Sequence, residues 1–322
     1  MLNRIEPSCV EELNQVVVPW QLTLRQLSRG ERDKRVRFRA LQDTIISNEC
    51  WSSYILGHGG TARDYVTVAG NNAELPVYWQ GETLGDNRLA VAPANVECEF
   101  HTPDGADHWV LLIPRDRFTG YFGVDSETEL IPRAGLVNCE PQAFRRLASL
   151  ANGLLDDSAH RQERADDETL QDLICSRVAD ALDSNGRQRG EWRVRYAHFR
   201  RALAFAEAMP GKLSVQQLAD AAGVSRRVLE LAFRENLGIA PHRVLKLIRL
   251  NKLHTDLLAV DPQQVQQVQQ VKVTEQMRIH GFDEFGRTAG EFRDLFGERP
   301  MELLNRPPPV KHRSFLQATA AA

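Results

Sequence analysis

Short apolar runs separated by Gly, Pro, Asn and Asp fill the chain from about residue 21 to residue 118. Runs of this length, rich in Val, Ile, Leu, Tyr and Trp, are typical of β-strands. Repeated short strands with turn residues between them predict an antiparallel barrel or sandwich. The predicted strands are QLTLRQLS (21–28), RVRFRAL (35–41), SSYILG (52–57), DYVTVAG (64–70), LPVYWQG (75–81), RLAVAP (88–93), VECEFHT (96–102) and HWVLLIP (108–114).

The apolar spacing changes to a helical period near Pro141, and it stays helical for most of the remaining chain. PQAFRRLASLANGLL begins with a proline suited to a first helical turn, and TLQDLICSRVADAL (169–182) is a second amphipathic segment. The polar stretch DSNGRQRGE (183–191) is the best boundary in the chain. We therefore predict an α+β protein with a β-rich domain over 1–140, a helical segment over 141–190, an all-α domain over 191–306 and a disordered tail over 307–322.

Charge is distributed unevenly between the two halves of the chain. Residues 1–190 carry 20 Lys and Arg against 29 Asp and Glu, whereas residues 191–322 carry 20 against 14. A basic module attached to an acidic one suits a chain in which only one part approaches phosphates. The five cysteines are scattered and never form a C-x-x-C pair, so we predict reduced thiols without a metal or disulfide role. No run of eighteen apolar residues and no signal-peptide pattern occurs, so we expect a cytoplasmic protein without a membrane partner.

The segment LSVQQLADAAGVSRRVLELAFRENLGIAP (213–241) predicts two short helices joined by a tight turn. Ser214 can cap the first helix, with Gln217 completing a capping box. Gly223 permits a left-handed turn, and Ser225 can cap the second helix. The two helices are thus expected to lie close together, as in a helix-turn-helix unit.

The second of these helices has one apolar and one polar face. At 100° per residue the apolar side holds Val228, Leu229, Ala232 and Phe233. The opposite side holds Arg227, Glu230, Leu231 and Arg234. An apolar face docked on a neighbour and an Arg-bearing face turned outward suit a recognition helix in the major groove of DNA.

A second unit, VTEQMRIHGFDEFGRTAGEFRDLFGERP (273–300), repeats this plan, with Thr274 and Asp283 as predicted caps and Gly281 as the turn. Between the units lies PQQVQQVQQVKV (262–273). Valines three residues apart favour an apolar stripe on a helix over a strand, and a disordered spacer is the alternative.

Residues from about 200 to 304 resemble the DNA-binding domain of AraC/XylS-type bacterial transcription regulators, in which a long helix joins two helix-turn-helix units. The resemblance rests on LADAAGVSRRVLELAF, LGIAPHRVLKLIRLNKLHTDLL, the GF at 281–282 and FRDLFGERP. The base-reading positions that it implies are Arg227, Glu230 and Leu231 in the first unit and Phe285, Gly286, Arg287 and Ala289 in the second. The second unit departs from the family. Gln276, Met277 and Arg278 stand where its first helix is normally apolar, and Thr288 stands where its recognition helix normally buries an aromatic residue. Gly286 and Gly290 further weaken that recognition helix.

The resemblance implies a regulator, expected to be an activator, that binds double-stranded promoter DNA and requires no cofactor. It also implies a cupin-like β-barrel that senses a small-molecule effector, homodimerisation through residues 141–183, and RNA polymerase as a partner. Phosphate contacts are expected from helix amino-termini and from exposed cations. The candidates are Ser214, Ser225, Arg226, Arg234, Arg243, Lys272 and Thr274.

Other interpretations of the chain remain open. His58, His101 and His108 suggest a metal-dependent β-barrel enzyme with an appended helical domain, although no closely spaced His-x-His occurs. A protein-binding module whose second unit no longer reads DNA is a further alternative. GHGGTARDY (57–65) is expected to be a hairpin turn, since it lacks a phosphate-loop lysine. Aromatic residues of the β-rich domain are candidates for lining an apolar ligand pocket, namely Trp51, Tyr54, Tyr78, Trp79 and Trp109.

Overall fold

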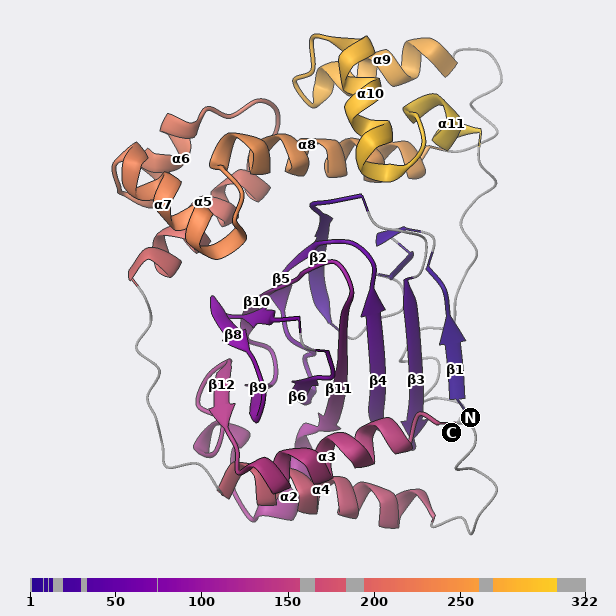
Figure 1. Ribbon diagram of the computed structural model, residues 1–322, viewed down its shortest axis with the longest axis vertical. Coiled ribbons are helices and arrows are strands. Elements are labelled where there is room, and N and C mark those ends of the chain that lie inside the picture. Colours follow the sequence, from indigo (N-terminus) through magenta and orange to yellow (C-terminus); the bar gives the residue numbers. More distant parts are fainter. Residues whose placement is uncertain are drawn as a thin grey trace. The chain divides into compact units, whose positions relative to one another are not determined.

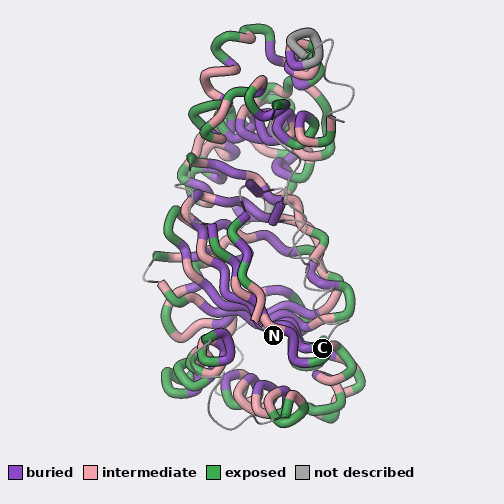
Figure 2. The backbone as a smooth tube through the Cα atoms, turned by 90° about the vertical axis from the view of Figure 1, so that its right-hand side faces the viewer, coloured by how far each residue is buried: buried purple, intermediate pink, exposed green. Residues whose placement is uncertain are grey.

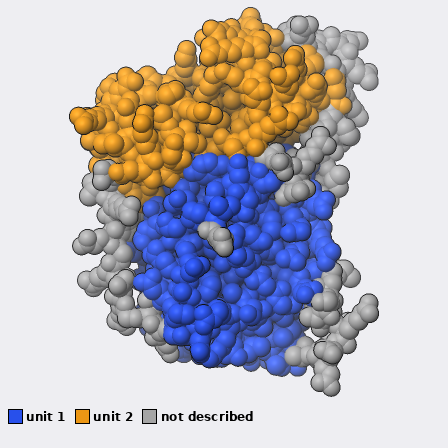
Figure 3. Space-filling view, in the orientation of Figure 1, with its two compact units in different colours: residues 1–24, 30–190, 311–322 blue, residues 25–29, 191–310 orange. Residues whose placement is uncertain are grey.

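A computed structural model describes most of the chain, which divides into two compact units. The described residues are 2–7, 9–10, 12–13, 20–29, 34–73, 75–156, 166–183, 194–260 and 269–305. Most of the Gln- and Val-rich tract, up to residue 268, and the tail predicted over 307–322 lie outside them. Unit 1 comprises residues 1–24, 30–190 and 311–322, and unit 2 comprises residues 25–29 and 191–310 (Figure 3).

Unit 1 is built on two antiparallel sheets (Figure 1). The seven-stranded sheet has the order β1-β3-β4-β11-β6-β9-β12, and the five-stranded sheet has the order β2-β5-β10-β7-β8. The strands are β1 (Leu2–Ile5), β2 (Gln21–Gln26), β3 (Arg35–Leu41), β4 (Thr44–Trp51), β5 (Ile55–Gly60), β6 (Tyr65–Asn71), β7 (Val77–Trp79), β8 (Glu82–Leu84), β9 (Arg88–Ala92), β10 (Glu97–Thr102), β11 (Ala106–Pro114) and β12 (Gly135–Asn138).

The antiparallel, β-rich prediction is confirmed, but the predicted barrel is not closed. Among the described strands neither order returns to its own start, so each sheet keeps two edges. The two sheets instead share one apolar layer, to which Phe38 and Ile45 of one sheet and Ile55 and Trp79 of the other contribute. Packing one sheet on another buries this core without closure.

Helices cover the other face of the seven-stranded sheet. They are α2 (Arg115–Phe122), α3 (Pro141–Gly153) and α4 (Asp167–Asp183), and a short 3-10 helix, η1 (Glu127–Glu129), follows α2. Their side chains Phe118, Leu147 and Ile174 join Ile46 and Leu111 of the sheet in a second apolar layer. The middle strands are therefore buried on both faces, which explains the continuous apolar run in β11 (Figure 2).

Strand β4 was not predicted, although it pairs with β3 and β11 in the middle of the sheet. Its sequence, TIISNECW, places Ser47, Asn48 and Glu49 at the centre, and all three are buried. Polar residues at these positions obscure the continuous apolar pattern that is typical of a strand buried on both faces. The short strands β1, β8 and β12 were likewise missed.

The hairpin turn predicted at GHGGTARDY (57–65) is wrong, because residues 57–60 belong to β5 and residues 61–64 lead to β6, which lies in the other sheet. Gly57 pairs with Phe100 of β10, and a Cβ on Gly57 would lie 2.4 Å from the Phe100 ring. Glycine is needed here for close approach of a neighbouring aromatic ring and not for a turn.

From residue 194 onward the described part of unit 2 is helical, as predicted, whereas its residues 25 and 26 end β2. Its helices are α5 (Val194–Ala208), α6 (Val215–Ala222), α7 (Arg226–Leu237), α8 (Pro241–Leu258), α9 (Gln269–Ile279), α10 (Phe285–Phe296) and α11 (Pro300–Leu304). Helices α5 to α7 lie at one end of α8, and α9 to α11 lie at the other (Figure 1). The Phe199 and Phe233 rings pack edge to face at 5.0 Å in the first group. His254 of α8 stacks on Phe296 at 4.2 Å in the second.

Candidate nucleic-acid interface and the pocket of unit 1

The first helix-turn-helix unit has the predicted caps and turn. The Ser214 hydroxyl accepts the backbone N–H of Gln217, and the Gln217 side chain accepts the backbone N–H of Ser214 at 2.9 Å. Gly223 has φ 68°, and the Ser225 hydroxyl accepts the backbone N–H of Val228. Two short-range signals therefore position α7 before any long-range contact is considered.

The outward face of α7 carries the predicted base-reading side chains. Leu229, Ala232 and Phe233 are buried, whereas Arg227, Leu231 and Arg234 are exposed and Glu230 is half-buried. Val228, predicted on the apolar side, is only half-buried. Helix α7 therefore presents Arg227, Leu231 and Arg234 outward, while its opposite face is packed against neighbouring helices.

The two arginines that open α7 differ in their partners. The Arg226 guanidinium donates to the Glu230 carboxylate at 3.1 Å, one helical turn away. Arg227 makes no ion pair with any residue that the structure describes. Arg226 must give up its ion pair before it can contact a nucleobase. Arg227 has no such ion pair to break, so it is the more readily available of the two. Arg243, near the start of α8, is also exposed.

Two predicted caps of the second unit are wrong. Helix α9 already begins at Gln269, so Thr274 lies inside a helix and its hydroxyl cannot cap the amino-terminus. The residue before α10 is Glu284, without a side-chain cap, and not Asp283. No helix breaker stands between Gln269 and Thr274, which lets the helix start earlier. Lys272 belongs to α9, and its side chain lies outside the described part.

The predicted base-reading residues of the second unit fall in the first two turns of α10. Phe285 is half-buried, with the Arg278 guanidinium 5.2 Å from its ring centre. Arg287 is exposed and donates to Glu284 and Glu291, each at 3.2 Å, and these carboxylates raise the pKa of Arg287. To contact a base, Arg287 must therefore give up its hydrogen bonds to these two carboxylates. Gly286 is exposed and Ala289 is half-buried.

We predict that Gly286→Ala and Gly290→Ala each stabilise the protein by about 0.5–1 kcal/mol, because glycine is a poor helix former. A Cβ at either position meets no atom within 4 Å, so the added methyl group brings no clash. Calorimetric melting of the full chain measures the effect. A lower melting temperature in either variant would contradict the prediction. A stabilised variant with weakened DNA binding would show that the bare backbone serves close approach to DNA.

Helix α8 connects the two helix-turn-helix units through polar contacts that the sequence did not reveal. Arg249 donates to the backbone carbonyl of Gly281 at 2.8 Å, and its guanidinium lies 4.5 Å from the Phe282 ring centre. One turn later, Lys252 donates to the backbone carbonyls of Ala206, Glu207 and Met209 at the end of α5. Both cations meet the carboxyl-terminal ends of helices, where they are favoured. They hold each helix-turn-helix unit against α8.

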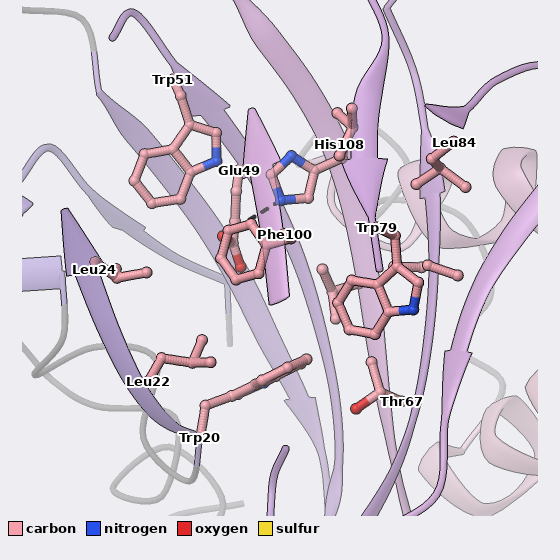
Figure 4. A pocket seen from close by; sticks show the side chains of 14 residues that line it. Trp20, Leu22, Leu24, Glu49, Trp51, Thr67, Trp79, Leu84, Phe100 and His108 are labelled. Carbon is pink, nitrogen blue, oxygen red and sulfur yellow. Dashed lines mark ion pairs between the residues drawn. The ribbon is translucent and has the colours of Figure 1, made fainter. Parts of the chain in front are cut away.

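An apolar pocket opens between the two sheets of unit 1 (Figure 4). Its cavity volume is about 50 Å³. The lining residues are Trp20, Leu22, Leu24, Glu49, Trp51, Thr67, Ala69, Val77, Trp79, Leu84, Ala90, Phe100, His108 and Val110. Room for a few small groups, mostly apolar walls and a few polar atoms together are typical of a ligand site.

Strand register brings the polar lining together. Glu49 of β4 lies opposite His108 of β11, and His108 Nε2 is 3.6 Å from Glu49 Oε2. The Ser47 hydroxyl donates to Glu49 Oε1 at 3.2 Å. The Trp51 indole N–H and the Thr67 hydroxyl are buried and have no hydrogen-bond partner among the described residues. These groups offer unused hydrogen-bonding capacity beside the cavity.

Only two of the five predicted aromatic residues line this pocket, namely Trp51 and Trp79. Trp109 belongs to the layer between the sheet and the helices, because successive side chains of β11 point to opposite faces. Tyr54 and Tyr78 do not line it, and both contact His101. Glu49 was missed, since no pattern marked its strand.

We predict that His101 makes folding of unit 1 sensitive to acid. Its Nδ1 lies 3.0 Å from the Tyr54 hydroxyl, and burial lowers its pKa to about 3. This folded-state pKa is below the unfolded value of about 6.5. The free energy of unfolding is therefore not reduced by His101 above pH 6.5, and it decreases as the pH falls from 6.5 toward 3. We expect His101→Gln to flatten that loss, which reaches about 1.4 kcal/mol per pH unit. Urea unfolding at pH 7 and pH 4.5 measures it, and unchanged pH dependence would contradict the assignment.

Among the residues that the structure describes, no group of three His, Cys, Asp or Glu side chains is placed to hold a metal ion, so the three histidines do not form one site. No helix in the described part is both long and apolar enough to cross a membrane.

Comparisons with known proteins agree on unit 2. A helix-turn-helix domain family matches residues 218–306. The probable thc operon regulatory protein of Rhodococcus erythropolis is 42% identical over 96 residues, which are 30% of this chain and 27% of that relative. The chain thus matches about a quarter of the relative's length.

Solved structures give similar matches. A probable AraC family transcriptional regulator from Rhodopseudomonas palustris CGA009 is 29% identical, covers 34% of this chain and 98% of its own, and has a TM-score of 0.30. The AraC-like transcriptional activator CuxR is 12% identical, covers 78% of this chain and 94% of its own, and has a TM-score of 0.44.

Proposed function

Because residues 218–306 are a helix-turn-helix domain of the AraC/XylS type, we propose that this protein is a regulator of transcription that binds promoter DNA through α7 and α10. The observation that carries the proposal is α7. It is capped by Ser225, packed through Phe233 and presents Arg227 outward without an ion pair to any described residue. Such a helix can enter the major groove without rearrangement.

The two helix-turn-helix units contribute differently in this proposal. Helix α7 reads bases through Arg227, with Glu230 and Leu231 beside it. Helix α10 contributes mainly phosphate affinity, since Arg287 is held by two carboxylates and Gly286 offers no side chain. Phosphates contact the amino-terminus of α7 at Ser225 and Arg226, and that of α6 at Ser214.

Unit 1 is proposed as the effector sensor, a cupin-like domain whose ligand occupies the pocket between its sheets. Support comes from the buried polar groups beside an apolar cavity. A bound effector can regulate DNA binding only if it has different affinities for two states of the protein.

The remaining parts of the proposal concern assembly. We propose that α3 and α4 form a homodimer through their outer faces, where Arg145, Arg146 and Ser149 are exposed. A dimer places two copies of unit 2 on two half-sites of one promoter. The proposed output is activation through RNA polymerase, in the cytoplasm, where promoter DNA is located.

Gel-shift of the full chain on DNA from upstream of its own gene tests the proposal. We expect a specific complex whose affinity falls steeply with salt, because released counterions accompany phosphate contacts. Matched DNA of scrambled sequence is the control. Equal affinity for both DNAs would refute sequence-specific regulation.

A further inference from the structure

Among the residues that the structure describes, the pocket of unit 1 is lined by an acidic side chain and by no basic one other than histidine. Among its lining residues Glu49 is the only carboxylate, His108 is the only other ionisable group, and neither Lys nor Arg is present. Glu49 is 8% exposed and His108 is 7% exposed. A carboxylate ligand would therefore meet a buried negative charge without a fixed positive partner, which is unfavourable.

The described residues use only part of the hydrogen-bonding capacity of Glu49. One oxygen accepts the Ser47 hydroxyl at 3.2 Å, while the other lies 3.6 Å from His108 Nε2, beyond ordinary hydrogen-bond length. An ionised carboxylate can accept about four hydrogen bonds. The carboxylate thus has room for a strong donor from the cavity, and a charged donor forms the stronger bond.

Aromatic side chains line the same pocket as this carboxylate. Trp51 stacks on His108 with ring centres 6.3 Å apart, and Trp79 lies between Trp20 at 6.5 Å and Phe100 at 6.4 Å (Figure 4). Aromatic faces attract organic cations, and tryptophan attracts them most strongly. Carboxylate and rings together favour a cationic ligand with an apolar body.

We propose that the pocket binds a small organic ammonium ion whose charged group meets Glu49 and whose aromatic or compact apolar body lies among the tryptophans. The inference rests on the proposed function, in which unit 1 is the sensor. The small cavity favours a body of one ring. A ring hydroxyl would in addition accept the Trp51 indole N–H, which lacks a described partner.

Calorimetric titration of the full chain with benzylamine, benzyl alcohol and benzoate at neutral pH tests the proposal. The three probes share one ring and differ in the charge of the attached group. We expect benzylamine to bind at least about tenfold more tightly than benzyl alcohol, and benzoate to bind most weakly. Equal binding of the alcohol, tightest binding of benzoate, or no binding of any probe to folded protein would overturn the proposal.

Glu49→Gln keeps the side-chain size and removes the charge, so it should reduce the preference for benzylamine over benzyl alcohol to about twofold or less. Glu97→Gln is the matched control, because this exposed glutamate of the same unit does not line the pocket. A preference retained in Glu49→Gln would refute the role of the carboxylate. If that variant fails to fold, the three-probe comparison on the unaltered chain still decides.

The gel-shift experiment without any probe separates this inference from the proposed function. Specific DNA binding without amine binding would refute only the ligand class. Amine binding without specific DNA binding would refute the regulator and leave the pocket assignment intact.

Discussion

Arg227→Ala is expected to abolish most sequence-specific DNA binding while leaving the fold intact. An arginine that contacts a guanine contributes about 1–3 kcal/mol of discrimination, which corresponds to roughly five-fold to more than a hundred-fold in affinity. Arg227 is exposed and makes no hydrogen bond or ion pair with any described residue, so its truncation should alter stability little. Gel-shift on the specific and the scrambled DNA gives the ratio of the two affinities, and this ratio should fall.

Arg63→Ala is the matched control, because Arg63 is an exposed arginine of unit 1 that lies outside the proposed dimer faces of α3 and α4. It removes the same charge from the chain without touching α7. If Arg227→Ala kept the specificity ratio of the unaltered protein, the assignment of α7 as the base-reading helix through this residue would be wrong. A uniform loss on both DNAs would instead indicate a phosphate contact.

Gly281→Ala is expected to destabilise unit 2 strongly and to detach the second helix-turn-helix unit from α8. Gly281 has φ 72°, and an added Cβ would lie 2.9 Å from Lys212 Cβ, 3.0 Å from the Lys212 backbone N and 3.3 Å from an Arg249 nitrogen. The left-handed backbone alone costs an alanine about 1–2 kcal/mol, and overpacking adds about 1–3 kcal/mol. Urea unfolding measures the total.

Gly223→Ala separates these two contributions. Gly223 has φ 68°, but a Cβ there meets no atom within 4 Å, so its variant carries backbone strain without a clash. Gly281→Ala should therefore be the more destabilising by about 1–3 kcal/mol. Its DNA footprint should lose protection at the α10 half of the site and keep it at the α7 half. Equal destabilisation by both substitutions would refute the steric contribution.

The local signals of unit 2 were readable from the sequence because their partners lie within four residues. Ser214 and Gln217 cap each other, and Gly223 and Ser225 form the next turn and cap. The same reasoning failed at Thr274, where the sequence shows a suitable cap residue but not that the helix already runs from Gln269. A residue type favours a cap, whereas the preceding backbone conformation decides whether one forms.

The β-rich unit was predictable in class but less so in detail. Continuous apolar runs identified β11, while Ser47, Asn48 and Glu49 concealed its neighbour β4. Buried polar residues are stable in a central strand only if other strands supply hydrogen bonds. Asn48, for example, donates to the backbone carbonyl of His108. Such partners lie about sixty residues away and leave no local pattern.

From the residue pattern we could predict the two helix-turn-helix units, the outward face of α7 and the antiparallel nature of unit 1. Helix caps, glycine turns and apolar periods act over a few residues, so they can be read directly from the chain. Tertiary structure alone decided that Glu49 meets His108 among tryptophans and that Arg249 of α8 holds the turn at Gly281. Strand register and helix packing join distant residues, and only the folded chain specifies which ones meet.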